Sequence, residues 1–426
     1  MSTRLAQRRL TASLTLALLT VVLSFEVPFP PSATQIRSSV VSQNDVLATS
    51  STALPVPVTQ TVQLASGTSA EIISCHTKKQ STNNFLSSLF GADEKKNDKP
   101  VLAFIHGSFH ASWCWAEYYM PFFAAMGYEC VAFSLQGTGG TPGTKFSLLH
   151  LNSHNIGLWS CLTLDCICCS IALALPEGSK KVKISNHVAD LNSFLCGLSN
   201  KTPNNLGLNL GDDPQIVLIG HSFGGLTIMK WLEEYFSSHT KVRNEISLAG
   251  VGLLCSVPPS GNGPMTLRYL LRSFRDSWKI TVGFAMKKAI VDKVLCRELF
   301  FGGDEVASGI SDEKLERYQS YFERDTVATI DLKDLAGKLP SLMVDKESGN
   351  AVFANALNGL ALKPFVMGAS DDFIVDKEGV IETAKYVGLN ADEVNFVESP
   401  HDIMLGKKWQ NGASAILGWI QTMQNS

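Results

Sequence analysis

Ser222 is the residue best placed to do chemistry in this chain. It stands in IVLIGHSFGG (216–225), where an apolar run leads into a glycine-rich motif. The glycines at 220 and 224 leave room for a sharp strand-to-helix turn, which holds a serine in strained backbone geometry with its hydroxyl accessible. The following helix directs its N-terminal N–H groups at the same point and favours an oxyanion there. The pattern therefore predicts a nucleophilic serine.

A serine hydroxyl is a weak nucleophile at neutral pH, so Ser222 needs a base and a group that orients the base. His401 lies in SPHDIML, directly after the last predicted strand, where a loop can bring its imidazole to the serine. The acid should follow the preceding strand, and GASDDFIVD offers Asp371 and Asp372. Asp372 is the expected acid because its spacing to Val375 fits an Asp-x-x-Val turn, and Asp371 is the alternative.

Acyl transfer also needs hydrogen-bond donors for the oxyanion of its tetrahedral intermediate. The backbone amide of Phe223, directly after the serine, is the first expected donor. The second is the amide of Ser108, in the loop FIHGSFH (104–110) that follows an earlier strand. His106 is expected to be structural. His110 and Trp113 are expected to pack this loop, with substrate contact as the alternative.

Short apolar strands alternate with helices after residue 100, a pattern typical of a mostly parallel sheet covered by helices. Strands are predicted at 101–107, 129–135, 215–220, 250–257, 363–369 and 394–399. Helices are predicted at 113–127, 187–198, 226–238 and 379–388. Ser222 thus stands between a buried strand and an amphipathic helix, which separates its motif from an ordinary glycine-rich turn.

Four segments together resemble a serine-type α/β-hydrolase: residues 100–115, the GHSFGG motif, GASDDFIVD and SPHDIML. The resemblance covers most of the chain after residue 100, and the order Ser222, Asp372, His401 is the family order. It implies an α/β-hydrolase fold, with a mostly parallel central sheet flanked by helices and an inserted helical cap. One departure is SLQGTGGT (134–141), which stands where the family often has Asp-x-Arg-Gly-x-Gly-x-Ser.

The resemblance also implies a reaction. A serine carboxylesterase or lipase-like enzyme would cleave an ester-like bond of a small or lipid-like substrate through an acyl-enzyme, with no cofactor and no metal. Relatives that open epoxides or displace halide carry aspartate at this turn, and some dienelactone hydrolases carry cysteine. The alternatives are a ligand-binding receptor with little turnover, or a cofactor-free peroxidase or acyltransferase that uses the same triad.

The chain divides into four predicted parts. Residues 1–61 are a targeting presequence and disordered linker, and residues 62–263 are the first part of the hydrolase core. Residues 264–357 interrupt the alternation of strands and helices with helical segments and are expected to form the cap, and residues 358–426 complete the core. Because a cap covers the reactive serine in this family, specificity is expected to reside there.

The N-terminal segment has the composition of a targeting signal. Three arginines precede the apolar stretch 10–25, which is shorter than the ~20 residues that a bilayer span needs. The following stretch is rich in Ser, Thr, Val, Ala and Pro, as transit peptides are. Together they resemble the two-part presequences of plastids bounded by extra membranes. The alternatives are secretion, or membrane anchoring through 10–25.

Composition excludes some partners. A net charge of −3 and a pI near 6.3 give no attraction to nucleic acid. Six cysteines are scattered singly and are expected to be buried, and the cluster at 161, 166, 168 and 169 lacks the ligand spacing of a metal site. The apolar segment 158–175 is either a lipid-facing lid, which would make peripheral membrane contact, or a gene-model artefact. The sequence does not predict an oligomeric state.

Overall fold

The computed structural model describes the folded unit of the chain from Leu54 onward. The described residues are 54–77, 99–143, 181–203, 205–237, 246–273, 278–280, 283, 287–340 and 364–424. The predicted signal at 10–25 and the segment 158–175 lie outside these ranges, as does the cysteine cluster at 161–169. No helix in the described part of the chain is both long enough and apolar enough to cross a membrane.

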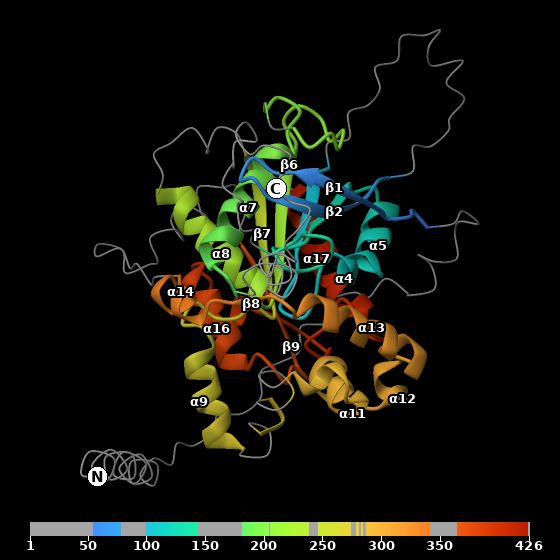
Figure 1. Cartoon of the computed structure of the whole chain (residues 1–426), viewed down its shortest axis with the longest axis vertical. Coiled ribbons are helices and arrows are strands. Elements are labelled where there is room, and N and C mark those ends of the chain that lie inside the picture. Colours follow the sequence, from blue (N-terminus) through green and yellow to red (C-terminus); the bar gives the residue numbers. More distant parts are fainter. Residues whose placement is uncertain are drawn as a thin grey trace, which may run out of the picture. The chain divides into compact units, whose positions relative to one another are not determined.

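Within the described residues, eight strands form one sheet in the order β1-β2-β4-β3-β6-β7-β9-β10 (Figure 1). β1 and β4 each pair with β2 in antiparallel fashion, and all the remaining neighbours in this sheet are parallel. The strands are β1 Val58–Gln63, β2 Ser69–Cys75, β3 Val101–Ile105, β4 Cys130–Phe133, β6 Gln215–His221, β7 Ser247–Leu254, β9 Phe365–Ala369 and β10 Asn395–Val397. The mostly parallel sheet predicted from the sequence is confirmed.

Helices flank the sheet on both faces. They are α4 Trp113–Ala116, α5 Tyr119–Ala125, α7 Ile184–Gly197, α8 Phe223–Ser237, α16 Lys377–Tyr386 and α17 Trp409–Gln424. α5 packs against α17 and α7 packs against α8, and Figure 1 shows these two pairs on opposite sides of the sheet. The central strand β3 is fully buried, as its continuous apolar sequence VLAFI requires.

The helix predicted over 113–127 is divided into α4 and α5. Pro121 lies in the first turn of α5, where its missing N–H is tolerated. In a continuous helix, however, the ring of Pro121 would clash with the carbonyl of Glu117 and no hydrogen bond would join them. The break between the two helices therefore follows from one proline that the aromatic pattern conceals.

The folded unit starts earlier than the sequence pattern suggests. β1 begins at Val58 and pairs with β2 along its whole length, although the composition predicts a presequence and linker over 1–61. Its side chains alternate between exposed and half-buried, which is the pattern of an edge strand with only one covered face. The sheet therefore includes residues 58–61, which the composition assigns to the linker.

The six single cysteines behave as expected. Their side chains are all buried: Cys75, Cys114, Cys130, Cys196, Cys255 and Cys296. Burial raises the pKa of the Cys75 thiol to about 11, with a further contribution from the neighbouring Glu129 carboxylate. A thiol in such surroundings is a small apolar group rather than a reactive one.

The segment between β7 and β9 is helical over most of its described length. Its elements are α9 Asn262–Arg272, η3 Lys288–Ile290, α11 Lys293–Cys296, η4 Arg297–Phe301, α12 Glu305–Ser308, α13 Asp312–Asp325, β8 Thr329–Ile330 and α14 Leu332–Gly337. β8 is the exception to the predicted helices, and it pairs in parallel with β5, Lys181–Val182. Ser311 caps α13 by accepting a hydrogen bond from the Lys314 amide at 3.3 Å.

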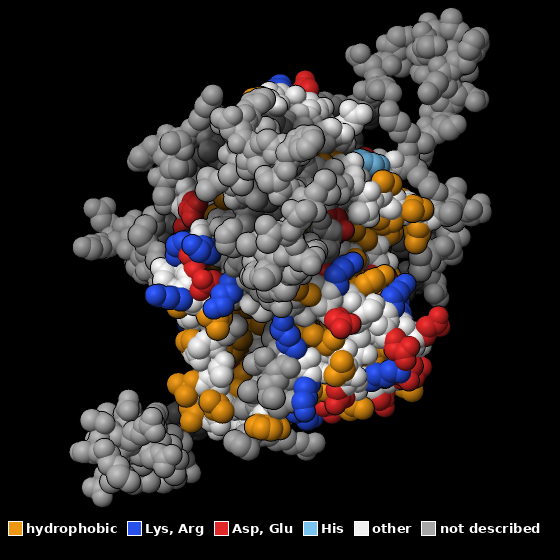
Figure 2. All heavy atoms as spheres, in the orientation of Figure 1, with side chains coloured by type: hydrophobic (Ala, Val, Ile, Leu, Met, Phe, Trp, Pro, Cys, Tyr) orange, Lys and Arg blue, Asp and Glu red, His pale blue; other side chains and the backbone are white. Residues whose placement is uncertain are grey.

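The surface between β7 and β9 carries mixed charges over most of the visible face and apolar side chains at α9. Figure 2 shows acidic and basic side chains intermixed on the visible face, whereas apolar side chains gather at α9. The exposed leucines there are Leu267, Leu270 and Leu271, each about half exposed. α9 is held to the start of α16, where Arg268 donates two hydrogen bonds, of 2.6 and 2.7 Å, to the buried Asp376 carboxylate.

Candidate active site

Ser222 occupies a strained turn between β6 and α8. Its φ is +52°, in the left-handed region that residues with a Cβ rarely adopt. The backbone around it is fixed from two sides, because the Ser222 amide donates to Leu254 O at 3.0 Å and the Ser222 carbonyl accepts from the Val257 amide at 3.1 Å. The end of β7 therefore holds the geometry that the glycine-rich motif predicts.

Two glycines permit the close approach of this turn to the end of β3. A Cβ at Gly224 would lie 2.5 Å from both Ile105 O and His106 O, which is far inside contact distance. A Cβ at Gly107 would lie 2.8 Å from the Ser222 Cβ. These glycines are required by space, and they bring the loop after β3 into direct contact with the serine turn.

Gly224→Ala is expected to lower the free energy of unfolding by about 1–3 kcal/mol, because the new methyl group meets backbone carbonyls that cannot move aside. Gly418→Ala, in α17, is the matched control. A Cβ at Gly418 meets nothing within 4 Å, so this change should stabilise the helix slightly. Urea denaturation of both variants measures the difference. Equal stability of the two variants would contradict the tight packing of the turn.

His401 and Asp372 form a buried hydrogen-bonded pair. The His401 Nδ1 lies 2.9 Å from Oδ1 and 2.8 Å from Oδ2 of Asp372, and both side chains are 2% exposed. Asp372 Oδ1 also accepts from the backbone amides of Ile374 and Val375, at 2.7 and 2.8 Å. The carboxylate is thus fixed by the turn that the Asp-x-x-Val spacing predicts, and it holds His401 with Nδ1 protonated and Nε2 available as a base.

Asp371 has a different environment. Its side chain is 51% exposed, and its carboxylate lies 3.3 Å from the Lys408 ammonium at the surface. Of the two neighbouring aspartates, Asp372 is therefore the one that faces His401.

Ser222 and His401 both follow the carboxyl ends of parallel strands, at the same edge of the sheet. His221, directly before the serine, donates from Nε2 to the His401 carbonyl at 2.9 Å. The described residues include no hydrogen bond between the Ser222 hydroxyl and the His401 ring. Catalytic hydrogen bonds of this kind commonly tighten only in the substrate complex.

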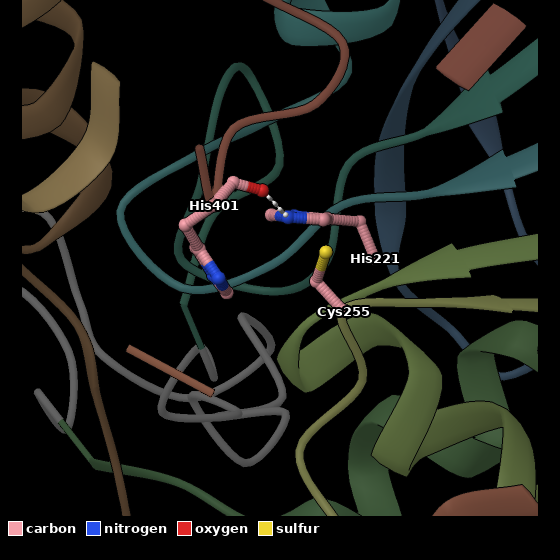
Figure 3. A group of neighbouring side chains, drawn as sticks. All are labelled: His221, Cys255 and His401. Atoms are coloured by element: carbon pink, nitrogen blue, oxygen red, sulfur yellow. Dashed lines mark hydrogen bonds between the residues drawn. The ribbon is translucent and has the colours of Figure 1, made fainter. Parts of the chain in front are cut away.

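His401 belongs to a buried cluster with His221 and Cys255 (Figure 3). His221, Cys255 and His401 each place one nitrogen or sulfur atom within 4.8 Å of the others. Figure 3 shows the His221 ring directed at the His401 backbone, with the Cys255 sulfur beside that ring. The His221 Nε2 bond to the His401 carbonyl and the Asp372 bond to His401 Nδ1 together hold the His401 loop in place.

Cys255 is itself strained, with a φ of +43° directly after β7. Burial raises the pKa of its thiol well above the ordinary value, and the adjacent Asp372 carboxylate raises it further. The group is therefore a neutral thiol that can donate a hydrogen bond to Asp372. Burial also lowers the pKa of His221 well below its usual range, so that His221 is neutral.

The loop that carries Ser108 is tied to the loop after β4 by His106. The His106 Nε2 accepts from the Leu135 amide at 3.0 Å, and its Nδ1 donates to Gly107 O at 2.8 Å. Burial lowers the pKa of His106 to about 4, which keeps the ring neutral as this bonding requires. The loop of Ser108 and the turn before α8 meet where Gly107 approaches Ser222. Ser108 directly follows Gly107 and is exposed, and Phe223, the first residue of α8, directly follows Ser222. The two proposed donor amides therefore belong to segments that are in contact.

The loop 134–141 lacks the charged residues of the family pattern, and the structure supplies carboxylates from elsewhere. Glu71 accepts from the Ser134 hydroxyl at 2.7 Å and from the Gly140 amide at 2.9 Å. Asp325, at the end of α13, accepts from the Gly139 amide at 2.8 Å. Two carboxylates from distant parts of the chain thus bind this loop, which the sequence motif does not reveal.

Asp325 also binds the start of α4, the helix that follows the Ser108 loop. Its Oδ2 accepts from the indole N–H of Trp113 at 2.9 Å, and its side chain is fully buried, paired with Arg324 at 2.7 Å. One carboxylate from α13 thus binds the 134–141 loop and the first residue of α4 at once. Trp113 packs against aromatic side chains of the same helix, Tyr318 and Tyr321.

Asp325→Ala is expected to lower the free energy of unfolding by about 1–3 kcal/mol, because it leaves two part-buried N–H groups without their acceptor. Glu323→Ala, on the exposed face of the same helix, is the control and should change stability little. Thermal and urea unfolding measure both. If Asp325→Ala were as stable as Glu323→Ala, the carboxylate would not hold α4 and the 134–141 loop in place.

Three features of the site are not predicted by the sequence. Asp325 has no local signal, because its role depends on how α13 packs. Cys255 stands within a predicted strand and reads as an ordinary core residue. His110 is expected to pack the loop, yet it pairs with Asp402. The acidic residue directly after His401 in SPHDIML is the one available clue to this pairing.

Comparison with known proteins agrees with this architecture. Residues 102–374 match the model of the alpha/beta hydrolase family. No match was found among curated proteins. Similar solved structures include potato (Solanum tuberosum) epoxide hydrolase I, with 17% identity, a TM-score of 0.49 and coverage of 86% of this chain and 99% of that one. An esterase from Exiguobacterium antarcticum has 12% identity, a TM-score of 0.47 and coverage of 85% and 100%. A bromoperoxidase from Bacillus anthracis has 12% identity, a TM-score of 0.48 and coverage of 85% and 100%.

With TM-scores below 0.5, these structural likenesses support no conclusion about this chain. The family model, in contrast, spans more than half of the chain and includes both the Ser222 turn and Asp372. The chain therefore belongs to the alpha/beta hydrolase family.

Proposed function

We propose that this protein is a serine hydrolase that cleaves an ester-like bond through an acyl-enzyme. The observation that carries the proposal is the left-handed backbone of Ser222 at the start of α8, on the same sheet edge as the His401–Asp372 pair. A left-handed backbone is unfavourable for serine, and such strain is found mostly at functional sites. We infer that this strain exposes a nucleophilic hydroxyl beside a helix N-terminus.

In the proposed reaction, Ser222 Oγ attacks the carbonyl carbon of the ester while His401 Nε2 takes the hydroxyl proton. The carbonyl π electrons move to oxygen, and the amides of Ser108 and Phe223 stabilise the resulting oxyanion. As the C–O bond to the alcohol breaks, the proton passes from His401 to the leaving oxygen. Water then attacks the acyl-enzyme by the same route, and Asp372 stabilises the imidazolium in both halves.

We propose a small or lipid-like ester with an apolar group as the substrate class. Support comes from the aromatic side chains packed around the Ser108 loop, where the Phe109 ring lies 5.6 Å from that of Phe300 and 6.2 Å from that of Phe322. The two partners of Phe109 come from η4 and α13, so the helical segment contributes to the surroundings of the site.

A panel of esters and thioesters that differ in acyl length tests the proposal directly. We expect many turnovers per protein molecule on at least one member of the panel, with a preference for apolar acyl groups. Product that stops at about one equivalent would instead indicate a receptor that binds and slowly processes its ligand. On the same preparation, bromide oxidation would identify a cofactor-free peroxidase, and acyl transfer to an alcohol would identify an acyltransferase.

A further inference from the structure

A second buried His–Asp pair lies beside the proposed catalytic residues. His110 belongs to the loop after β3, and Asp402 directly follows His401. His110 Nε2 lies 3.0 Å from Asp402 Oδ2, and the two side chains are 1% and 0% exposed. The pair joins two loops that are 292 residues apart in the sequence.

The hydrogen-bond partners of His110 fix the number of protons in the pair. His110 Nδ1 lies 2.8 Å from the Ser108 carbonyl oxygen, which can only accept, so Nδ1 carries a proton. The contact between Nε2 and Oδ2 also needs one proton, which resides either on the imidazole or on the carboxyl group. In both forms the pair is neutral overall and holds one proton more than a neutral histidine beside a carboxylate.

The surroundings favour retention of this proton. The His110 ring stacks on Trp113 at 5.5 Å and meets the edges of Phe300 and Phe322. Asp402 Oδ1 is buried and has no hydrogen-bond partner among the described residues. The titratable groups that face the pair are His106, His221, Asp325, Cys114, Cys255 and Cys296. A net negative charge among these buried groups would be costly.

The pair is connected to both parts of the proposed catalytic machinery. On one side, the Nδ1 proton of His110 holds the carbonyl of Ser108, whose own amide is the proposed oxyanion donor. The next residue, Phe109, has a φ of +69°, so this loop needs an external bond to keep its shape. On the other side, Asp402 adjoins the proposed base His401, and its amide donates to Phe300 O at 3.1 Å.

We propose that His110 and Asp402 are a positioning pair that, through one shared proton, holds Ser108 in place relative to His401. The proposal rests on the proposed function, because it assigns a task to the Ser108 amide. It predicts that loss of the pair lowers kcat more than it changes KM, since an oxyanion donor acts mainly in the transition state.

The pair also predicts a pH dependence of defined sign. Burial alone would lower the pKa of His110, but the Asp402 carboxylate and the hydrogen bonds raise it above the ordinary value. Because the pKa of His110 is higher in the folded than in the unfolded state, protonation of His110 stabilises the fold. This stabilisation is complete below the unfolded-state pKa of about 6.5 and is lost as the pH rises through the folded-state pKa. Stability and activity should therefore both decline on the alkaline side when the shared proton is lost.

Three variants test the proposal. Asp402→Asn can donate to a neutral His110 and so keeps both contacts without a titrating proton. His110→Phe keeps the ring packing but removes both hydrogen bonds. The single change His110→Phe would leave the Asp402 carboxylate buried without a partner, which destabilises the fold. The double variant His110→Phe/Asp402→Leu removes this carboxylate as well and so avoids an unpaired buried charge.

We expect Asp402→Asn to retain kcat within about 5-fold at pH 7 and to lack the alkaline decline of the wild type. The double variant should unfold at a temperature close to that of the wild type, yet its kcat should be lower by about 10-fold to 100-fold, with KM little changed. A double variant with wild-type kcat would overturn the proposal, as would Asp402→Asn with an unchanged alkaline decline.

Thermal unfolding as a function of pH separates this inference from the proposed function. The midpoint of the wild type should fall on the alkaline side relative to that of Asp402→Asn, whether or not any ester is turned over. Absence of turnover together with this difference would reject the hydrolase while retaining the proton-sharing pair. Identical pH profiles of the two midpoints would reject the pair even if the enzyme were active.

Discussion

Replacement of Ser222 by alanine is expected to abolish ester turnover and to prevent labelling by a fluorophosphonate probe, while the protein stays folded. Loss of the hydroxyl removes the group that forms the acyl-enzyme, so the rate should fall by about 10⁴-fold or more. Alanine fits the same turn, because the backbone there is held by Leu254 and Val257 rather than by the serine side chain. Gel fluorescence after probe treatment and a circular dichroism spectrum make the two measurements.

Ser320→Ala is the matched control for this experiment. Ser320 is exposed on α13 and its hydroxyl donates to the Arg317 carbonyl of the same helix, at 2.7 Å. This variant should be labelled as strongly as the wild type. Persistent labelling of Ser222→Ala would mean that another residue is the nucleophile.

Asp372→Asn is expected to reduce kcat by about 10⁴-fold with little effect on the fold. The asparagine amide can donate to His401 Nδ1, which then gives up its proton and leaves Nε2 protonated. A ring in that tautomer cannot take the proton of Ser222. Because the Asp372 Oδ1 bonds to Ile374 and Val375 survive the change, the turn should keep its geometry. Steady-state kinetics with the best ester of the panel gives the comparison.

Asp371→Asn is a control one residue away. Its carboxylate is half exposed and pairs at the surface with Lys408. We expect its kcat to remain within about 3-fold of the wild type. If Asp371→Asn were the more damaging change, Asp371 rather than Asp372 would be the acid of the triad.

The sequence predicts best those parts of the structure that depend on local pattern. The continuous apolar runs of β3 and β6 indicate buried strands. The glycines around Ser222 indicate a turn that packs closely against the end of β3. The choice of Asp372 over Asp371 also follows from a local rule, since the carboxylate must accept the Val375 amide. Periodicity and turn chemistry act over a few residues, so one sequence suffices to read them.

The features that the sequence does not predict depend on contacts between distant segments. β1 is an edge strand with weak alternation, and its composition resembles that of the linker before it. Asp325 and Glu71 accept hydrogen bonds from the 134–141 loop, and neither carries a motif of its own. The same holds for His110, whose partner lies near the opposite end of the chain. Such pairings are determined by tertiary packing and leave no periodic signal.

The carboxylate of Asp325 links the position of α13 to two other segments of the chain. It bonds at once to Trp113, the first residue of α4, and to Gly139, while the carboxylate itself belongs to α13. A displacement of α13 must either stretch both bonds or carry these two segments along with it. For the proposed hydrolase we therefore expect thermodynamic coupling between α13 and the site, so that a mutation far out on the helical segment should alter kcat without contacting the substrate.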